Sequence, residues 1–148
     1  MLKNIDPAIY AELLYVLMLM GHGDDIVLCD VNHPAVTIAK ETTYGSLLNL
    51  SGLTIPQATK AILSLMPLDT FVEQPVMRMR VVGDPDGVVP VFQKMQDTVD
   101  LCESRAVTIG ALDRFDFYAA AKKSFAIVRT SDPGPYGCFI LRKGVITL

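Results

Sequence analysis

Apolar residues near the start of the chain recur every three or four positions: Ile9, Leu13, Leu17 and Met20. This spacing is typical of one face of an α-helix. Asp6-Pro7 is a favourable helix start, because the carboxylate can cap the first turn and proline lacks an N–H that would be unpaired there. Gly21 supplies a stop. The pattern predicts a helix from Pro7 to about Met20.

The remaining faces of this first helix are also apolar, since they carry Leu14, Val16, Met18 and Leu19. A helix that is apolar nearly all round is buried on more than one side. We therefore expect the protein's own sheet to cover one side and another subunit to cover a second.

Further along the chain, helical and strand patterns alternate. Helices are predicted at residues 54–66, from about 90 to 102, and from Asp113 to about 124; strands are predicted at residues 26–30, 76–82, 106–109, 125–130 and 138–142. In the strand 76–82, Arg78 and Arg80 share one face, which we interpret as solvated or ion-paired. The alternation predicts a single domain over residues 1–148, a layered α/β/α fold with a mostly parallel central sheet.

Composition narrows the classes of partner. The 148 residues include 13 Lys and Arg against 16 Asp and Glu, a net charge of −3. A mildly acidic chain without a basic block argues against nucleic acid or an anionic membrane as the main partner. The hydrophobic fraction of 51% is slightly high for a small soluble monomer, which again favours an oligomer.

Features of cellular location point to the cytoplasm. The apolar run at residues 13–20 resembles a signal-peptide core, but Asp6 and Glu12 stand where a positive flank is needed. The cysteines Cys29, Cys102 and Cys138 are odd in number and widely spaced, which is typical of a reducing compartment. We predict a cytoplasmic protein.

Sequence motifs for common nucleotide cofactors and for a catalytic serine are missing. No G-x-G-x-x-G, G-x-x-x-x-G-K-[ST] or G-x-S-x-G occurs. Dinucleotide, P-loop and nucleophile-elbow chemistries therefore have no support, and we expect no cofactor.

The first candidate for chemistry is His22, which lies between two glycines after the first predicted helix. An unperturbed histidine gives or takes a proton near neutral pH. Asp30 is the last residue of the predicted strand 26–30, and ligands bind outside the carboxyl ends of strands in open α/β sheets. Alternatively, His22 merely occupies a helix C-terminus, where the helix dipole favours it. A metal site of His22, Asp30 and His33 is a further alternative, but the spacing is not that of a helix-borne ligand pair and we expect no metal.

Two later segments carry further candidates. Arg114 and Tyr118 are four residues apart, so they share one helix face and can reach one ligand. Tyr136 precedes Gly137 after a proline-rich loop, where its hydroxyl can face a ligand. The alternative for the first pair is a surface arginine beside a tyrosine hydroxyl.

Taken together, these segments resemble the L-fucose mutarotase and D-ribose pyranase family of the RbsD/FucU type. The likeness lies in G-H-G-D at residues 21–24, the strand-end Asp30, R-F-x-F-Y at residues 114–118 and Y-G at residues 136–137, and it extends over nearly the whole chain. Arg114 and Gly137 place the sequence in the fucose-type branch. Cys138 departs from the family pattern, which has asparagine there.

The resemblance implies an isomerase that interconverts the α and β anomers of L-fucose or a closely related monosaccharide by acid/base ring opening and closing. It implies His22 as the catalytic acid/base and a sugar-binding set of Asp30, Arg114, Tyr118, Tyr136 and Cys138. It also implies a homo-oligomer, a ring-like decamer with sites between subunits. The alternatives are a non-catalytic sugar-binding accessory of a transport or utilisation system, the metal enzyme described above and a purely structural assembly protein.

Overall fold

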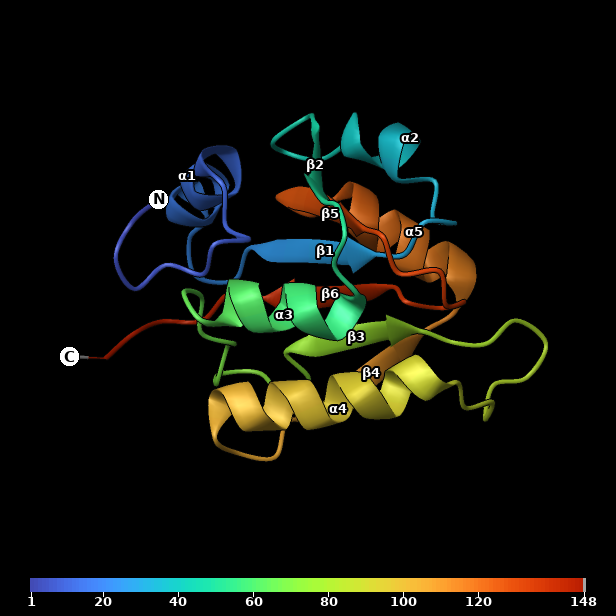
Figure 1. Ribbon diagram of the computed structural model, residues 1–148. Coiled ribbons are helices and arrows are strands. Elements are labelled where there is room, and N and C mark those ends of the chain that lie inside the picture. The colour runs from blue at the N-terminus through green and yellow to red at the C-terminus, as the bar shows by residue number, and fades with distance from the viewer. Residues whose placement is uncertain (148) are drawn as a thin grey trace.

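The computed structural model describes residues 1–147, in which six strands form one sheet (Figure 1). The strands are β1 (Asp25–Cys29), β2 (Leu47–Leu50), β3 (Val76–Met79), β4 (Ile109–Leu112), β5 (Ala126–Thr130) and β6 (Phe139–Arg142). Their order across the sheet is β2-β5-β1-β6-β3-β4. β6 runs antiparallel to β1 and β3, and the other pairs are parallel. The mostly parallel sheet is confirmed.

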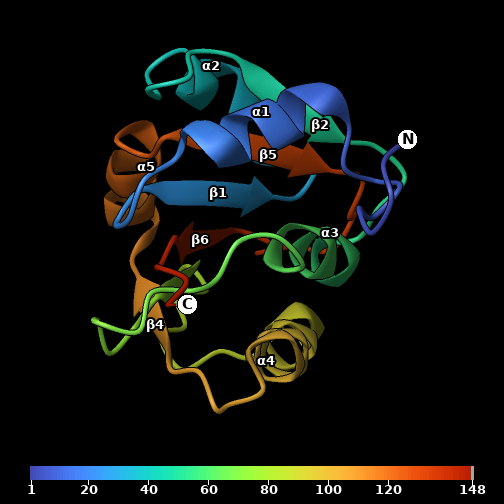
Figure 2. The same ribbon diagram turned by 90° about the vertical axis from the view of Figure 1, so that its left-hand side faces the viewer.

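Helices cover both faces of the sheet: α1 (Ala11–Leu19), α2 (Ala35–Ala39), α3 (Ile55–Leu63), α4 (Pro90–Glu103) and α5 (Arg114–Lys122). Figure 2 shows α5 on one side and α3 and α4 on the other. Alternate residues of β1 enter two cores: Ile26 and Leu28 pack with α1, α3 and α4, whereas Val27 and Cys29 pack with α2 and α5. The predicted α/β/α layers are therefore confirmed.

Local sequence signals explain several boundaries. Thr54 and Gln57 form a capping box at the start of α3, where the Gln57 Oε1 atom accepts the Thr54 N–H at 2.9 Å. Asp113 is the residue before α5, as predicted. Its carboxylate makes no capping hydrogen bond to the helix and pairs with Arg80 at 3.2 Å instead. Arg78, in contrast, is half-buried with its guanidinium carbon 4.0 Å from the Phe92 ring centroid.

Other boundaries differ from the sequence predictions. α1 begins at Ala11, because the Asp6 carboxylate accepts the Ala8 N–H at 2.9 Å and closes a turn there. β4 is shifted by three residues toward the C-terminus from the predicted strand 106–109. α2 and β2 were not predicted, since five and four residues are too short to establish a period.

One face of α1 remains uncovered. Tyr15, Met18 and Leu19 are exposed, and Met18 retains 77% of its accessible surface. Apolar exposure of this kind marks interaction surfaces, and coverage by another subunit stays a prediction. Among the helices within residues 1–147, none is both long enough and apolar enough to cross a membrane.

Candidate active site

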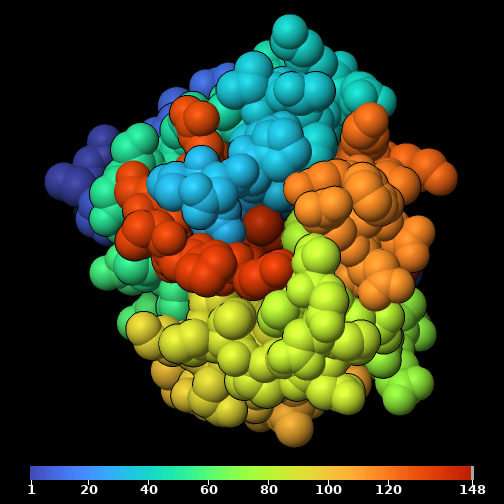
Figure 3. All heavy atoms as spheres, turned by 90° about the vertical axis from the view of Figure 1, so that its right-hand side faces the viewer, coloured from blue at the N-terminus to red at the C-terminus, as the bar shows by residue number. Residues whose placement is uncertain are grey.

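A cleft of about 260 Å³ opens at the carboxyl end of β1. Parallel strands end at one edge of a sheet, and the antiparallel β6 begins at that same edge, so four segments meet there. The space-filling view in Figure 3 shows them around the hollow: residues near 30 (light blue), 82 (yellow-green), 114–118 (orange) and 135–136 (red). All five predicted sugar-binding residues line the cleft: Asp30, Arg114, Tyr118, Tyr136 and Cys138.

The Asp30 carboxylate joins the two strands behind the cleft and is only 2% exposed. One oxygen accepts the N–H groups of Asn32 and His33 at 2.8 and 3.2 Å, and the other accepts that of Gly137 at 2.9 Å. A Cβ atom on Gly137 would lie 3.2 Å from that of Asp30, so a small residue allows this close approach. Asp30 therefore fixes the backbone of the site, with little capacity left for a ligand.

His33 and Cys138 form a second buried contact in the cleft wall. The His33 Nδ1 atom lies 3.4 Å from the Cys138 sulfur, which is 3.7 Å from an Asp30 oxygen. Burial lowers the pKa of His33 to about 4, and burial raises the pKa of the Cys138 thiol well above its usual value. Burial likewise raises the pKa of Cys29. At neutral pH the imidazole is uncharged and both cysteines are thiols.

This burial predicts a pH dependence of stability. The unfolded chain protonates His33 near pH 6.5 but the folded chain only near pH 4, so the unfolded state binds more protons between these values. Stability is therefore lost as the pH falls through that window, by about 3 kcal/mol at pH 4 from this residue.

Urea unfolding at pH 7, 5.5 and 4.5 gives the free energy of unfolding of the wild type and of the His33→Phe variant. The variant keeps the groups that face His33, namely Asp30, Cys138 and Tyr118. The wild type is expected to lose more stability than the variant on acidification. Equal losses in the two proteins would contradict the assignment.

Arg114, Tyr118 and Tyr136 supply the polar groups at the mouth of the cleft. Arg114 and Tyr118 lie on the same face of α5, as predicted, and the Arg114 guanidinium carbon is 4.7 Å from the Phe115 ring centroid. The Tyr136 hydroxyl oxygen accepts the Val82 N–H at 3.0 Å, so its own proton is free to be donated. Tyr136 has φ 60°, a left-handed conformation that the adjacent turn imposes. These groups suit a ligand with several hydroxyls.

His22 lies elsewhere in the same chain. Its loop precedes β1, whereas Asp30 follows β1, and the strand between them spans roughly 13 Å. Within one chain, Asp30 is therefore too far from His22 to contact it. The same separation keeps His22 away from His33 within one chain, and in the described part of the chain no group of three His, Cys, Asp or Glu side chains is placed to hold a metal.

The carboxylate that holds His22 is Asp69, which the sequence analysis missed. The His22 Nε2 atom lies 3.2 Å from an Asp69 oxygen that also accepts the Phe71 N–H at 3.0 Å. This backbone hydrogen bond, with His22 beside it, lowers the pKa of the Asp69 carboxyl. The His22 side chain remains 45% exposed, whereas Asp69 is buried. An accessible imidazole is thus oriented by a buried carboxylate.

Lys143 fixes the loop that carries His22. Its Nζ atom donates to the carbonyls of Leu17 and Met20 at the end of α1, where a cation is favoured. Its backbone makes two hydrogen bonds with the loop. The Lys143 carbonyl accepts the Gly23 N–H, and the Lys143 N–H donates to the Asp24 carbonyl, each at 2.9 Å. The position of His22 is therefore set by the last strand as well as by α1.

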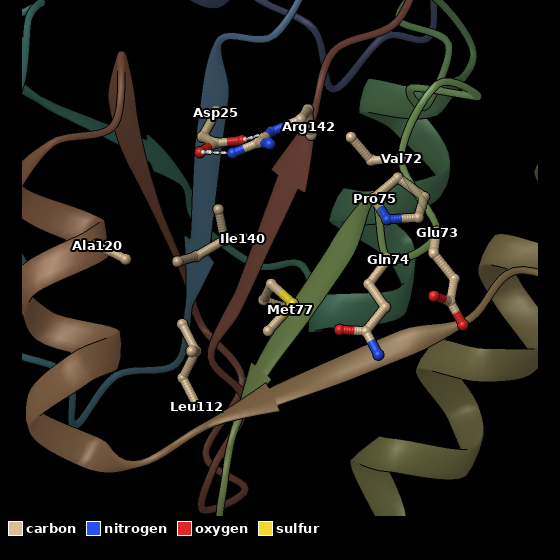
Figure 4. A pocket seen from close by; sticks show the side chains of 10 residues that line it. All are labelled: Asp25, Val72, Glu73, Gln74, Pro75, Met77, Leu112, Ala120, Ile140 and Arg142. Carbon is tan, nitrogen blue, oxygen red and sulfur yellow. Dashed lines mark hydrogen bonds and ion pairs between the residues drawn. The ribbon is translucent and has the colours of Figure 1, made fainter.

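A larger cavity of about 420 Å³ lies at this second end of the sheet, on the face covered by α5 (Figure 4). Asp25 and Arg142 form a two-pronged ion pair in its wall at 2.9 and 3.1 Å. The Asp25 carboxylate raises the pKa of Arg142. The Arg142 carbonyl accepts the Asp69 N–H at 3.0 Å, so the ion pair braces the strand beside the His22–Asp69 pair.

An open α/β sheet whose ligand-binding side chains gather at the carboxyl ends of its strands is typical of proteins that bind small molecules. Comparison with known proteins defines the group further. The model of the RbsD / FucU transport protein family matches residues 3–146, and the chain belongs to this family.

Individual relatives are similar over almost their full length. The human fucose mutarotase is 42% identical, with 99% of this chain and 96% of the relative covered. The L-fucose mutarotase of Haemophilus influenzae is 35% identical, with 98% and 97% covered. The crystal structure of the Streptococcus pneumoniae fucose mutarotase in complex with L-fucose has a TM-score of 0.88 and 38% identity, with 99% and 100% covered.

Proposed function

We propose that this protein is a fucose mutarotase, an isomerase that interconverts the α and β anomers of L-fucose or a closely related monosaccharide. Its relatives carry that name at 35–42% identity. The observation that carries the proposal is the cleft of Arg114, Tyr118 and Tyr136, whose charged and hydroxyl groups suit a sugar.

The reaction requires proton transfers alone. One group removes the proton of the anomeric hydroxyl while the ring oxygen is protonated; the ring opens to the aldehyde, the C1–C2 bond rotates, and the ring closes on the other face. We assign the proton transfers to His22, because it is accessible and its Nε2 atom is held by Asp69. An imidazole can both accept and donate a proton, so it is suited to both directions of transfer.

The cleft residues take separate roles in binding. Arg114 offers a planar fork of donors to sugar oxygens, and Tyr118 and Tyr136 offer hydroxyls. Asp30 positions the strand ends by its hydrogen bonds to Asn32 and Gly137. Cys138 contributes the floor of the cleft with a nearly buried sulfur.

A complete site of this kind contains two subunits. His22 and the cleft lie at opposite ends of β1, so His22 of one copy enters the cleft of the next in a ring-like homo-oligomer, which we propose to be a decamer. The uncovered face of α1 supports an assembly, because Met18 and its neighbours are exposed apolar groups. The three free cysteines support a cytoplasmic location.

One observation favours a second candidate function, a non-catalytic sugar-binding accessory. Position 138 carries a thiol whose sulfur is almost fully buried. Such a group is a poor hydrogen-bond partner for a sugar.

Exchange NMR on L-fucose at equilibrium tests the proposal. Saturation of one anomeric proton transfers to the other only as fast as the anomers interconvert, so no coupling enzyme is needed. We expect the protein to accelerate the transfer for L-fucose and less for D-ribose. Binding of both sugars without acceleration of either would favour the accessory function instead.

A further inference from the structure

The contact between His33 and Cys138 leaves one polar atom of the cleft wall unsatisfied. His33 is 7% exposed, and its Nδ1 atom faces the Cys138 sulfur at 3.4 Å. Its Nε2 atom is buried, and no partner for it exists among the residues that the structure describes. A buried polar atom without a partner destabilises the folded state, so a ligand or water that pairs with it gains that energy.

The protons of this pair determine what Nε2 can do. The neutral imidazole carries one N–H, and the thiol carries one S–H. If the thiol donates to Nδ1, then Nε2 is a donor; if Nδ1 donates to sulfur, then Nε2 is an acceptor. A sugar hydroxyl satisfies either form, because a hydroxyl both donates and accepts.

The surroundings of the ring place this nitrogen close to the ligand space. His33 and Tyr118 both line the cleft, and their rings meet edge to face with centroids 5.3 Å apart. The Phe117 ring also meets the imidazole edge to face, with ring centroids 5.9 Å apart. A phenylalanine at position 33 would fill this aromatic slot without an unpaired nitrogen. Because Nε2 is buried, a ligand reaches it only if a neighbouring side chain shifts, and the adjacent Tyr118 is only half-buried.

We propose that His33 is a substrate-binding residue, whose Nε2 atom pairs with a sugar hydroxyl and takes the place of an amide at position 138. This inference rests on the proposed sugar-binding function of the same cleft. Cys138 contributes indirectly, since its sulfur contacts both Nδ1 of His33 and a carboxylate oxygen of Asp30. The thiol therefore orients the imidazole and leaves the direct contact to it.

A double-mutant cycle tests this assignment in the intact protein. In the anomer-exchange assay, His33→Phe is expected to raise KM for L-fucose about tenfold and leave kcat within about threefold, as for one lost neutral hydrogen bond. In a Cys138→Asn background the added amide supplies the contact, so His33→Phe should then change KM less than threefold. Cys102→Asn, a cysteine on α4 outside the cleft, is the matched control and should leave KM unchanged.

If His33→Phe raises KM tenfold in both the wild-type and the Cys138→Asn backgrounds, His33 does not take the place of an amide at position 138. If His33→Phe leaves KM unchanged in the wild-type background, His33 does not bind the substrate. Where His33→Phe folds poorly, the wild type provides the readout. The chain has only two histidines, so ¹⁵N-histidine labelling gives two pairs of ring signals that the His22→Gln variant assigns.

Titration with L-fucose is expected to shift the His33 Nε2 signal saturably. A static His33 signal, while the sugar is seen to bind by other signals, would overturn the inference. A saturable His33 shift without anomer exchange would uphold it and refute the mutarotase function, whereas no binding at all would refute both.

Discussion

Replacing His22 with glutamine is expected to lower kcat for anomer exchange by about 10²–10³-fold, the usual contribution of a positioned acid/base group. Glutamine keeps a polar side chain that can still pair with Asp69, so the loop and its hydrogen bonds should survive. The cleft residues that we propose to bind the sugar lie at the other end of β1 in the same chain, so this substitution leaves their side chains unchanged. The affinity for L-fucose should therefore stay within about threefold of the wild type.

Exchange NMR at several sugar concentrations separates these two quantities, and circular dichroism checks the fold. Asp24→Asn serves as the matched control in the same loop, because it keeps the contact to the Gly21 N–H but holds no atom of the imidazole. A His22→Gln protein that retains the wild-type kcat would remove His22 from the mechanism.

Secondary structure was predictable where the sequence carries a strong local signal. The continuous apolar run of β1 gave a strand within one residue of the structure, and Thr54 with Pro56 gave the start of α3 within one residue, although the helix ends at Leu63 and not at residue 66. The start of α1 was wrong because a capping carboxylate and proline also suit a tight turn, and Asp6 forms one. Only tertiary packing determines such cases.

The candidate site was predictable in part for a related reason. The rule that ligands bind after parallel strands placed Asp30 at the right edge, and the helical spacing of Arg114 and Tyr118 placed them on one face. The separation of His22 from the cleft follows from its place before β1, because residues at the two ends of a strand lie at opposite edges of the sheet. Asp69 carried no signal, since a single aspartate in the segment after the second predicted helix belongs to no recognisable motif.

The two halves of the proposed site make a second prediction, which concerns the assembly. Arg114→Ala removes the charged donor of the cleft, and we expect an activity loss of at least about tenfold from one charge-assisted contact. His22→Gln removes the acid/base group. In a site shared between subunits, one copy of the chain contributes His22 and the neighbouring copy contributes Arg114. A mixed oligomer then contains some sites with an intact cleft from one copy and an intact His22 from the other.

Co-expression of the two variants with different affinity tags, followed by purification on both tags, gives such mixed oligomers. Random assembly restores about a quarter of the sites, because each site needs one particular copy on each side. The control pairs Arg114→Ala with the double variant His22→Gln/Arg114→Ala, in which every cleft is defective.

The activity of the mixed oligomer decides whether the mutarotase site is shared between subunits. We predict exchange of L-fucose anomers near a quarter of the wild-type rate per site, and no recovery in the control. Activity no higher than the average of the two single variants would show that His22 and the cleft do not combine across subunits, and would contradict the account.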